Sequence, residues 1–529
     1  MQKRYAVQVK WALEQTEAAL APLAAKAMGI APGQIEAVEI TKQSIDARKG
    51  GVCFQVALAV SVRRGVKARP DWKPIEEKKA PAFALGTKRM QNSPVVIGAG
   101  PCGLFAALML ARQGYAPVVL ERGSALAQRQ RTVQTFFDGG AFDPQCNVLF
   151  GDGGAGAFSD GKLTSRGKDP LGRLVLETLA QHGAPQEILI QNKAHIGTDR
   201  LRPVIESIKR EVLQKGGAWY NDTRAVEFVY REGAVAAVKA LHNGQLIELP
   251  ACCVVLAIGH SARDTYERLA LDGVEMVFKP FAVGVRIEHP QAMIDQAQYG
   301  QYAGHPKLGA AEYALTAQSG GRGVYTFCMC PGGQVIPSVS EEGLLCVNGM
   351  SQHARDGENA NSAVVVQVRQ EDVPGGLLGG LAFQREMERA AFAAGGGGYA
   401  APIQTFGDFA AGKRTRKLGG VLPSYPRQTQ GSDLSAVLPG FVAQGIKEGV
   451  ASFGRRLKGF DRPDALLCGV ETRTSAPLRI LRGEDGQSPS VRGLYPAGEG
   501  AGYAGGIVSA AVDGIRAASH IMAEYAPIL

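Results

Sequence analysis

Two cysteines one residue apart, Cys328 and Cys330, have side chains that could do redox or acid–base chemistry. Alternate side chains of a β-strand share a face, so this extended segment is expected to direct both thiols at one cavity. A thiol or thiolate there could act as an acid, a base or a redox partner. The same pair also fits two small buried hydrophobic side chains.

His260, His289 and Arg286 are further candidates for a reacting centre. A histidine titrates near neutral pH and suits proton transfer, although each of these two also fits a hydrogen-bonded structural residue. Arg286 could hold an anionic substrate. The sequence does not choose among them, and Cys330, Cys328 and His260 are the catalytic candidates. No second Cys/His pair stands at zinc-site spacing, so no metal site is predicted.

A glycine-rich turn between two apolar runs predicts the scaffold for such chemistry. A short β-branched run enters G-x-G-x-x-G at Gly98, Gly100 and Gly103, and a second run ends at Glu121. Gly98 permits a tight turn, Gly100 lets the backbone approach a pyrophosphate, and Gly103 lets the helix pack on the strand. The helix N-terminus offers N–H groups to phosphates. The segment therefore predicts a dinucleotide site.

Glu121 lies where a carboxylate can accept hydrogen bonds from ribose hydroxyls. An acid rather than an arginine at this position favours an unphosphorylated ribose, and so FAD or NAD over NADP. Arg122 follows directly and is included in the predicted cofactor site.

A second glycine-rich segment, 151–163, contains Gly154, Gly156 and Ser159. Glycines and alanines exclude side chains, so a flat ring or a ribityl chain could lie against the backbone here. The polar residues at its end would add hydrogen-bonding groups. A flexible surface loop is the alternative interpretation.

Two later segments complete the pattern. An apolar run ends at Gly259, where backbone can approach a dinucleotide at the carboxyl edge of a sheet. Gly498 and Glu499 precede Gly506 and Ile507, which open an alanine-rich helix with a second anion-binding N-terminus. Such an end can stabilise negative charge on a reduced flavin. Contacts so widely separated in the chain favour FAD over NAD.

The segments 153–163, 279–290 and 498–513 together resemble the uncharacterised FAD-dependent dehydrogenases of the glutathione-reductase-like flavoprotein superfamily. The resemblance covers residues 90–529, and its motifs name no substrate. It implies a cofactor site with two halves, one that binds the ADP part and one around the ribityl chain and the flavin ring. The first would comprise Gly98, Gly100, Gly103 and Glu121, and the second Gly156, Ser159, Gly498, Glu499, Gly506 and Ile507.

The predicted fold class is α/β. A Rossmann-type FAD-binding domain of the glutathione-reductase-like kind carries an inserted, mainly antiparallel substrate domain and a small N-terminal α+β domain. The predicted boundaries are an N-terminal domain at 1–66, a linker at 67–93, the first part of the FAD-binding domain at 94–275, the substrate domain at 276–488 and the C-terminal part of the FAD-binding domain at 489–529.

Composition sets the broad class. A chain of 529 residues is long for one core, and 45% hydrophobic with 20% charged residues is typical of a globular protein. No apolar run reaches the roughly 18 residues of a membrane helix, and the first residues lack a signal core. Nine cysteines without framework spacing indicate a reducing compartment. A cytoplasmic protein without a membrane span is expected.

The predicted function is an FAD-dependent oxidoreductase that moves a hydride between FAD and an unidentified small organic substrate. With one nucleotide fingerprint, NAD(P)H is expected only as a transient electron donor. The alternatives are an RNA-modifying flavoprotein, motivated by the net charge of +9, and a non-catalytic flavin-binding scaffold. The basic clusters at 412–417 and 455–458 lack interleaved aromatic residues, so nucleic acid is not an expected partner. The sequence leaves the oligomeric state open.

Overall fold

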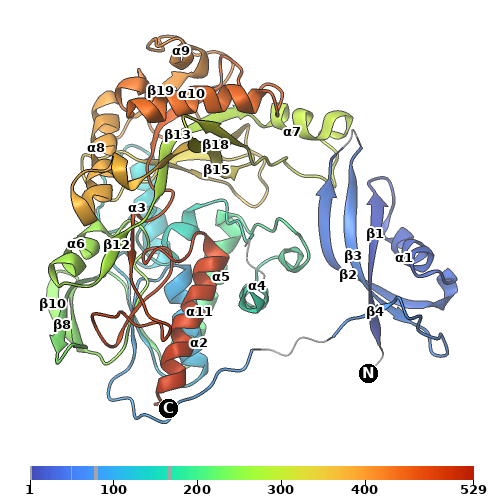
Figure 1. Cartoon of the computed structure of the whole chain (residues 1–529), viewed down its shortest axis with the longest axis horizontal. Coiled ribbons are helices and arrows are strands. Elements are labelled where there is room, and N and C mark those ends of the chain that lie inside the picture. Colours follow the sequence, from blue (N-terminus) through green and yellow to red (C-terminus); the bar gives the residue numbers. More distant parts are fainter. Residues whose placement is uncertain (1–2, 49–50, 77–80, 165–168, 529) are drawn as a thin grey trace.

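A five-stranded parallel sheet lies at the centre of the chain (Figure 1). The computed structural model describes residues 3–48, 51–76, 81–164 and 169–528. Its strands stand in the order β23-β11-β5-β6-β7. They are short, and all but the edge strand β7 are almost wholly buried, as parallel strands covered on both faces should be. Their bounds are β5 Val95–Ile97, β6 Val118–Leu120, β7 Ala218–Tyr220, β11 Val254–Leu256 and β23 Leu494–Pro496.

Two helices from opposite ends of the sequence pack side by side on this sheet. They are α2, Pro101–Arg112, and α11, Ile507–Glu524. Their backbones approach closely, since a Cβ added at Gly514 would meet the Cys102 carbonyl oxygen at 2.0 Å. Strand β23, which follows the 276–488 region in the sequence, thus completes a sheet begun by β5, and α11 packs on that sheet.

Further elements surround the sheet. Helices α3 (Leu126–Phe137), α4 (Pro170–Gln181) and α5 (Thr198–Gln214) connect β6 to β7, and α6 (Arg263–Leu271) follows β11. A separate three-stranded antiparallel sheet precedes β11. It consists of β8 (Thr223–Arg231), β9 (Ala234–His242) and β10 (Gln245–Pro250).

A seven-stranded sheet covers the carboxyl edge of the parallel sheet. Its order is β14-β15-β18-β13-β21-β19-β20, antiparallel except for the β19–β20 pair. The strands are β13 Phe281–Pro290, β14 Thr316–Ser319, β15 Arg322–Cys330, β18 Asn359–Val368, β19 Ala401–Thr405, β20 Thr429–Gly431 and β21 Leu466–Glu471.

Helices α9 (Phe406–Ala410) and α10 (Gly440–Gly454) lie over the side of this sheet that faces away from the parallel sheet, and α8 (Gly379–Ala394) packs against β19 and β21 at its flank (Figure 1). The chain enters and leaves this part through β12 (Met276–Phe278) and β22 (Leu478–Ile480), which pair with each other. A short hairpin pairs β16 (Gln334–Pro337) with β17 (Val347–Met350), and α7 (Gln291–Tyr299) follows β13.

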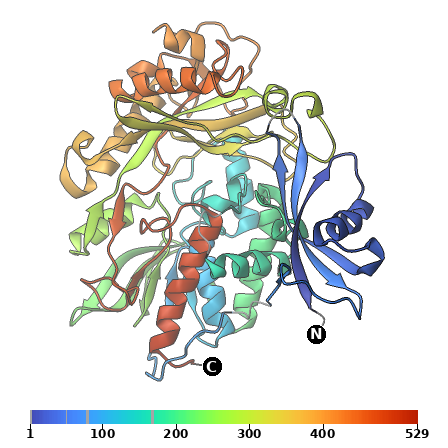
Figure 2. The ribbon, with the colours of Figure 1, turned by 45° about the vertical axis from the view of Figure 1, so that its right-hand side comes forward.

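The N-terminal unit has its own antiparallel sheet, in the order β2-β3-β1-β4, and its own buried core. Helix α1 covers the face that points away from the rest of the chain (Figures 1 and 2). The elements are β1 Arg4–Ala12, α1 Leu20–Met28, β2 Ile35–Asp46, β3 Cys53–Val62 and β4 Lys73–Pro74. Because β4 and the buried Trp72 belong to this sheet and core, the unit continues into the segment predicted as a linker.

Hydrogen bonds and apolar contacts from the 299–308 segment dock the N-terminal unit. Lys307 Nζ donates to the Leu13 and Gln15 carbonyls at 2.6 and 2.7 Å and lies 5.3 Å from the centre of the Trp11 ring. The backbone of Gln43 bonds to that of Ile190. Among the described helices, none combines the length and apolar character needed to cross a membrane.

Candidate functional site

A cleft lies at the carboxyl edge of the parallel sheet, where the seven-stranded sheet covers it. It encloses about 1490 Å³ of empty space, including its open mouth. All the predicted glycine-rich segments reach it. The predicted residues that line it are Gly98, Gly100, Glu121, Arg122, Gly154, Gly156, Ser159, Gly259, His260, Cys328, Glu499, Gly506 and Ile507. Gly103, Cys330 and Gly498 are not among the lining residues.

The turn after β5 has the close contacts that its glycines predicted. Gly98 adopts φ 98°, and a Cβ there would meet the Ala257 carbonyl oxygen at 2.4 Å. A Cβ at Gly103 would lie 1.8 Å from the Gly98 carbonyl oxygen, so helix and turn touch through backbone. Gly100 caps α2 and Pro101 opens it, which directs the free N–H groups of this helix end into the cleft.

Glu121 joins three backbone segments. Its buried carboxylate accepts N–H bonds from Ala99 at 2.7 Å, Gly123 at 3.0 Å and Gly151 at 2.8 Å. An ionised carboxylate offers about four acceptor positions. One therefore stays available for a ribose hydroxyl, and the ribose contact stays a prediction.

Arg122 forms part of the wall beside Glu121. Its guanidinium lies 2.7 Å from the Asp264 carboxylate and 4.4 Å from the centre of the Phe150 ring. The side chain is thus held along the cleft by two partners.

The segment after Gly154 turns polar at Ser159. The Ser159 hydroxyl donates to the Gly156 carbonyl at 3.0 Å and accepts the Gly161 N–H at 3.1 Å. Burial raises the pKa of Asp160, but the charges of Lys162 and Arg355 lower it further, so its net pKa is below the ordinary value. Lys162 also donates to the Met329 carbonyl, which links this segment to β15.

The two cysteines do not sit on a regular strand. The pairing of β15 with β18 shifts between Phe327 and Cys330, and Cys328 adopts φ 44°. Cys328 is half-buried and lines the cleft, whereas Cys330 is fully buried behind it. The simple alternation expected from the sequence is replaced by a bulge.

Positive charge surrounds the thiols. A hydrogen bond from Cys330, and the charges of Arg286 and Lys162, lower the pKa of Cys328 to about 6 against the opposing effect of burial. The bond to Cys328 and burial raise the pKa of Cys330. The pair therefore favours a thiolate at Cys328 beside a thiol at Cys330.

Arg286 is fully buried, and its hydrogen bonds all go to protein groups. It donates to Glu471 at 2.7 Å, Asn361 at 2.8 Å and the Cys328 carbonyl at 2.6 Å. It is absent from the cleft lining. The alternative role of holding a substrate is therefore not available to it in this arrangement.

The two histidines differ in position. His260 lines the cleft with Nδ1 2.8 Å from the Ser261 hydroxyl, and burial with the Arg473 and Arg263 charges lowers its pKa to about 3. It is neutral at physiological pH. His289 packs against Phe460 outside the cleft, with Nε2 2.7 Å from the carbonyl of that residue. Burial lowers its pKa to about 4.

Glu499 directs a carboxylate at the cleft. Burial raises its pKa to about 7, against the lowering effect of the Lys279 charge. No hydrogen bond joins this carboxylate to any part of the chain that the structure describes. It is therefore a candidate proton donor or acceptor near neutral pH.

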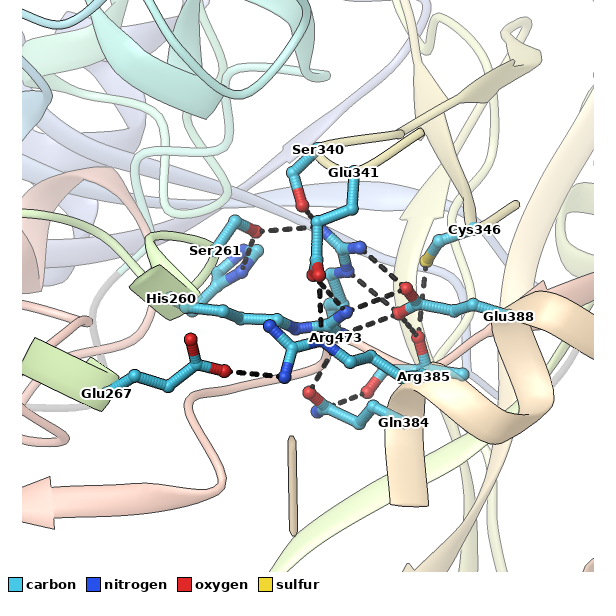
Figure 3. A network of polar contacts seen from close by, with 12 residues as sticks. His260, Ser261, Glu267, Ser340, Glu341, Cys346, Gln384, Arg385, Glu388 and Arg473 are labelled. Carbon is cyan, nitrogen blue, oxygen red and sulfur yellow. Dashed lines mark hydrogen bonds and ion pairs between the residues drawn. The ribbon is translucent and has the colours of Figure 1, made fainter. Parts of the chain in front are cut away.

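Sequence reasoning missed a buried charge network at one end of the cleft (Figure 3). The Glu388 carboxylate, on α8, binds Arg263 of α6 at 2.8 Å and Arg473 at 2.7 Å. Arg473 also lines the cleft and donates to the Ser340 hydroxyl at 2.6 Å. These residues lie far apart in the sequence, and no local pattern marks them as partners.

The cleft fits an extended flavin dinucleotide. A Cβ added at Gly259 or Gly506 would meet no described atom within 4 Å, so the backbone borders open space. The N-termini of α2 and α11 both reach the lining, one suited to a pyrophosphate and the other to an electron-rich ring. The donor set therefore matches FAD chemically.

Three family profiles match the chain. They are described as "FAD binding domain" at residues 92–135, "FAD-dependent protein, C-terminal domain-like" at 280–474 and a domain of unknown function at 1–61. The first contains the β5–α2 turn, and the second contains the seven-stranded sheet.

An uncharacterized protein of Clostridium beijerinckii is 47% identical over 509 residues, covering 94% of this chain and 95% of its own. Solved structures give lower similarity. A geranylgeranyl bacteriochlorophyll reductase-like protein of Thermoplasma acidophilum is 12% identical, covers 82% of this chain and 79% of its own, and has a TM-score of 0.36. Glycine oxidase of Bacillus cereus is 11% identical, covers 83% of this chain and 99% of its own, and has a TM-score of 0.34.

Proposed function

Because the chain belongs to the same protein family as its Clostridium beijerinckii relative, and its cofactor is FAD, we propose that it is an oxidoreductase of a small organic substrate. Bound FAD supplies a ring that accepts or donates a hydride. We also propose that the chain belongs to the glutathione-reductase-like superfamily, which the parallel sheet order and the β5–α2 turn support.

The proposed cofactor contacts follow from the lining. The α2 N-terminus at Gly100 would hold the pyrophosphate, and Glu121 the ribose. Gly506 and Ile507, at the start of α11, would face the electron-accepting side of the ring.

The observation that carries the proposal is a cleft shared by two parts of the chain. The parallel-sheet part contributes the glycine-rich backbone, and residues of the 276–488 region contribute side chains opposite it. These side chains are Phe327, Cys328, Asn348, Arg473 and Thr474. A substrate bound among them would be held next to the cofactor site and partly shielded from water.

The residues of the chain would then handle charge and protons. Arg473 is fixed by Glu388 and can attract an anionic group. Glu499, with a pKa of about 7, can hold or release a proton at its carboxylate. His260 is neutral and can only accept a proton at low pH.

Anaerobic mixing of the purified yellow protein with NADH or NADPH tests the proposal. Rapid loss of flavin absorbance would identify a nicotinamide-driven reductase with a transient donor. A yellow protein that NAD(P)H does not reduce would instead take electrons from its own substrate. A properly folded chain that retains no FAD would contradict the proposed function.

A further inference from the structure

A pair of thiols borders the cleft and has no part in holding the cofactor. Cys328 lines the same cleft as Gly259 and Glu499, and Cys330 lies directly behind it. The Cys330 thiol donates to the Cys328 carbonyl oxygen at 3.4 Å, and both residues are free cysteines.

The backbone around the pair is compatible with a bond between the sulfurs. In a regular strand the rise is about 3.3 Å per residue, so the Cα atoms of residues two apart are separated by about 6.6 Å. That is close to the upper Cα separation of disulfides, about 6.8 Å. The bulge in β15 and the φ of 44° at Cys328 bend the strand, so we expect a shorter separation here.

The surrounding positive charges favour the thiolate, which is the nucleophile in thiol–disulfide exchange. Arg286 Nη2 lies 3.8 Å from Cys330 Sγ and donates to the Cys328 carbonyl at 2.6 Å. Lys162 reaches the Met329 carbonyl between them. Both cations are held in place beside the pair, Arg286 by Glu471 and Lys162 by Asp160.

We propose that Cys328 and Cys330 form a reversible dithiol–disulfide couple that exchanges an electron pair with the FAD of this chain. The inference rests on the proposed function. In the oxidising direction the Cys328 thiolate bonds to the Cys330 sulfur, the Cys330 S–H bond breaks, and two electrons and one proton leave the pair. Oxidised FAD takes both electrons and the proton, directly or through solvent. The reverse step restores one thiolate and one thiol.

Reductive titration of the FAD-loaded full chain tests this couple. After oxidation and removal of the oxidant, the wild-type chain is expected to consume about four electrons per FAD from dithionite, and each of Cys328→Ser and Cys330→Ser about two. Cys53→Ser, which alters a half-buried cysteine of β3 in the N-terminal unit, is the matched control and should consume about four.

Peptide mass spectrometry of the wild-type chain gives a second readout that needs no variant. In the oxidised holoprotein, the peptide with Cys328 and Cys330 should resist alkylation and be lighter by two hydrogen atoms than the reduced peptide. After dithionite it should gain two alkyl groups. An uptake of about two electrons in all four proteins, with both thiols alkylated throughout, would overturn the couple but leave the FAD-based function intact. A chain without bound FAD would contradict the function itself.

Discussion

Gly100 is the residue at which the proposed pyrophosphate contact requires a backbone without a side chain. It caps α2 inside the cleft, and the nearest described atom to an added Cβ is the Gly154 Cα at 3.8 Å. A branched side chain would occupy the space above the helix end and cover its N–H groups.

Gly100→Val is therefore expected to raise the Kd for FAD by at least about tenfold, the equivalent of roughly 1.4 kcal/mol in binding, and so to lower the ratio of FAD to protein. The ratio is measured from flavin absorbance after denaturation. Gly440→Val, at the start of α10 and outside the cleft lining, is the matched control and should keep its FAD. Full FAD retention in Gly100→Val would remove the pyrophosphate assignment.

Glu499 makes stability depend on pH in a defined direction. Burial raises its pKa from 4.5 to about 7 in the folded chain, so between these values the folded state binds more protons than the unfolded state. Stability from this group is therefore lost as pH rises through the window. In Glu499→Gln, the fall in unfolding midpoint between pH 4.5 and 7 should be shallower than in wild type.

Urea unfolding across this pH range measures the effect on the flavin-free chain. Glu248→Gln, an exposed change on β10, is the control and should track the wild type. Parallel pH profiles for Glu499→Gln and wild type would show that Glu499 does not carry the shifted pKa.

At the scale of elements, the Glu388 network joins α6 beside the parallel sheet to α8 at the flank of the seven-stranded sheet (Figure 3). The carboxylate is fully buried between two arginines. The Arg263 and Arg473 charges lower its pKa well below the ordinary value, despite the opposing effect of burial. Removing it leaves two buried cations without their anion.

Glu388→Ala is expected to lower the free energy of unfolding by about 3–5 kcal/mol, the usual cost of breaking a buried ion pair from one side. Denaturant unfolding measures this. Glu386→Ala, an exposed change on the same helix, should alter it by less than about 0.5 kcal/mol. Equal effects of the two substitutions would mean that the network does not tie the two parts together.

Local elements could be predicted from the sequence where their cause is local. The β5–α2–β6 unit follows from a β-branched run, glycines at three spaced positions and an acid at 121. The bulge at Cys328 and the Arg263–Glu388–Arg473 network could not be predicted, because each depends on strands or helices from distant parts of the chain. The same is true of the three N–H bonds of Glu121, which come from two separate loops and its own turn.

At the scale of the molecule, the cleft and the N-terminal unit are separate. The lining residues described all belong to segments from Ile97 onward, while the N-terminal unit has its own core and docks chiefly through Lys307 and Gln43. Among the described residues, the unit thus contributes no side chain to the lining of the cleft.

Deletion of residues 1–74 is therefore expected to leave the ratio of FAD to protein unchanged. Leu308 and Tyr302, which pack on the N-terminal core, would become exposed, so the shortened chain should also aggregate more readily. Flavin absorbance and light scattering measure the two effects. Loss of FAD from a shortened chain with native circular dichroism would show that the N-terminal unit supports the cleft.

The last strand of the parallel sheet has a consequence for synthesis on the ribosome. Strand β23 pairs with β11, and α11 supplies Gly506 and Ile507 to the cleft, yet both are translated after the whole seven-stranded sheet. A nascent chain therefore cannot enclose the cofactor when its glycine-rich turn first emerges, although domains begin to fold during synthesis. Flavin capture must be a late, nearly post-translational event, and prematurely terminated chains should be colourless.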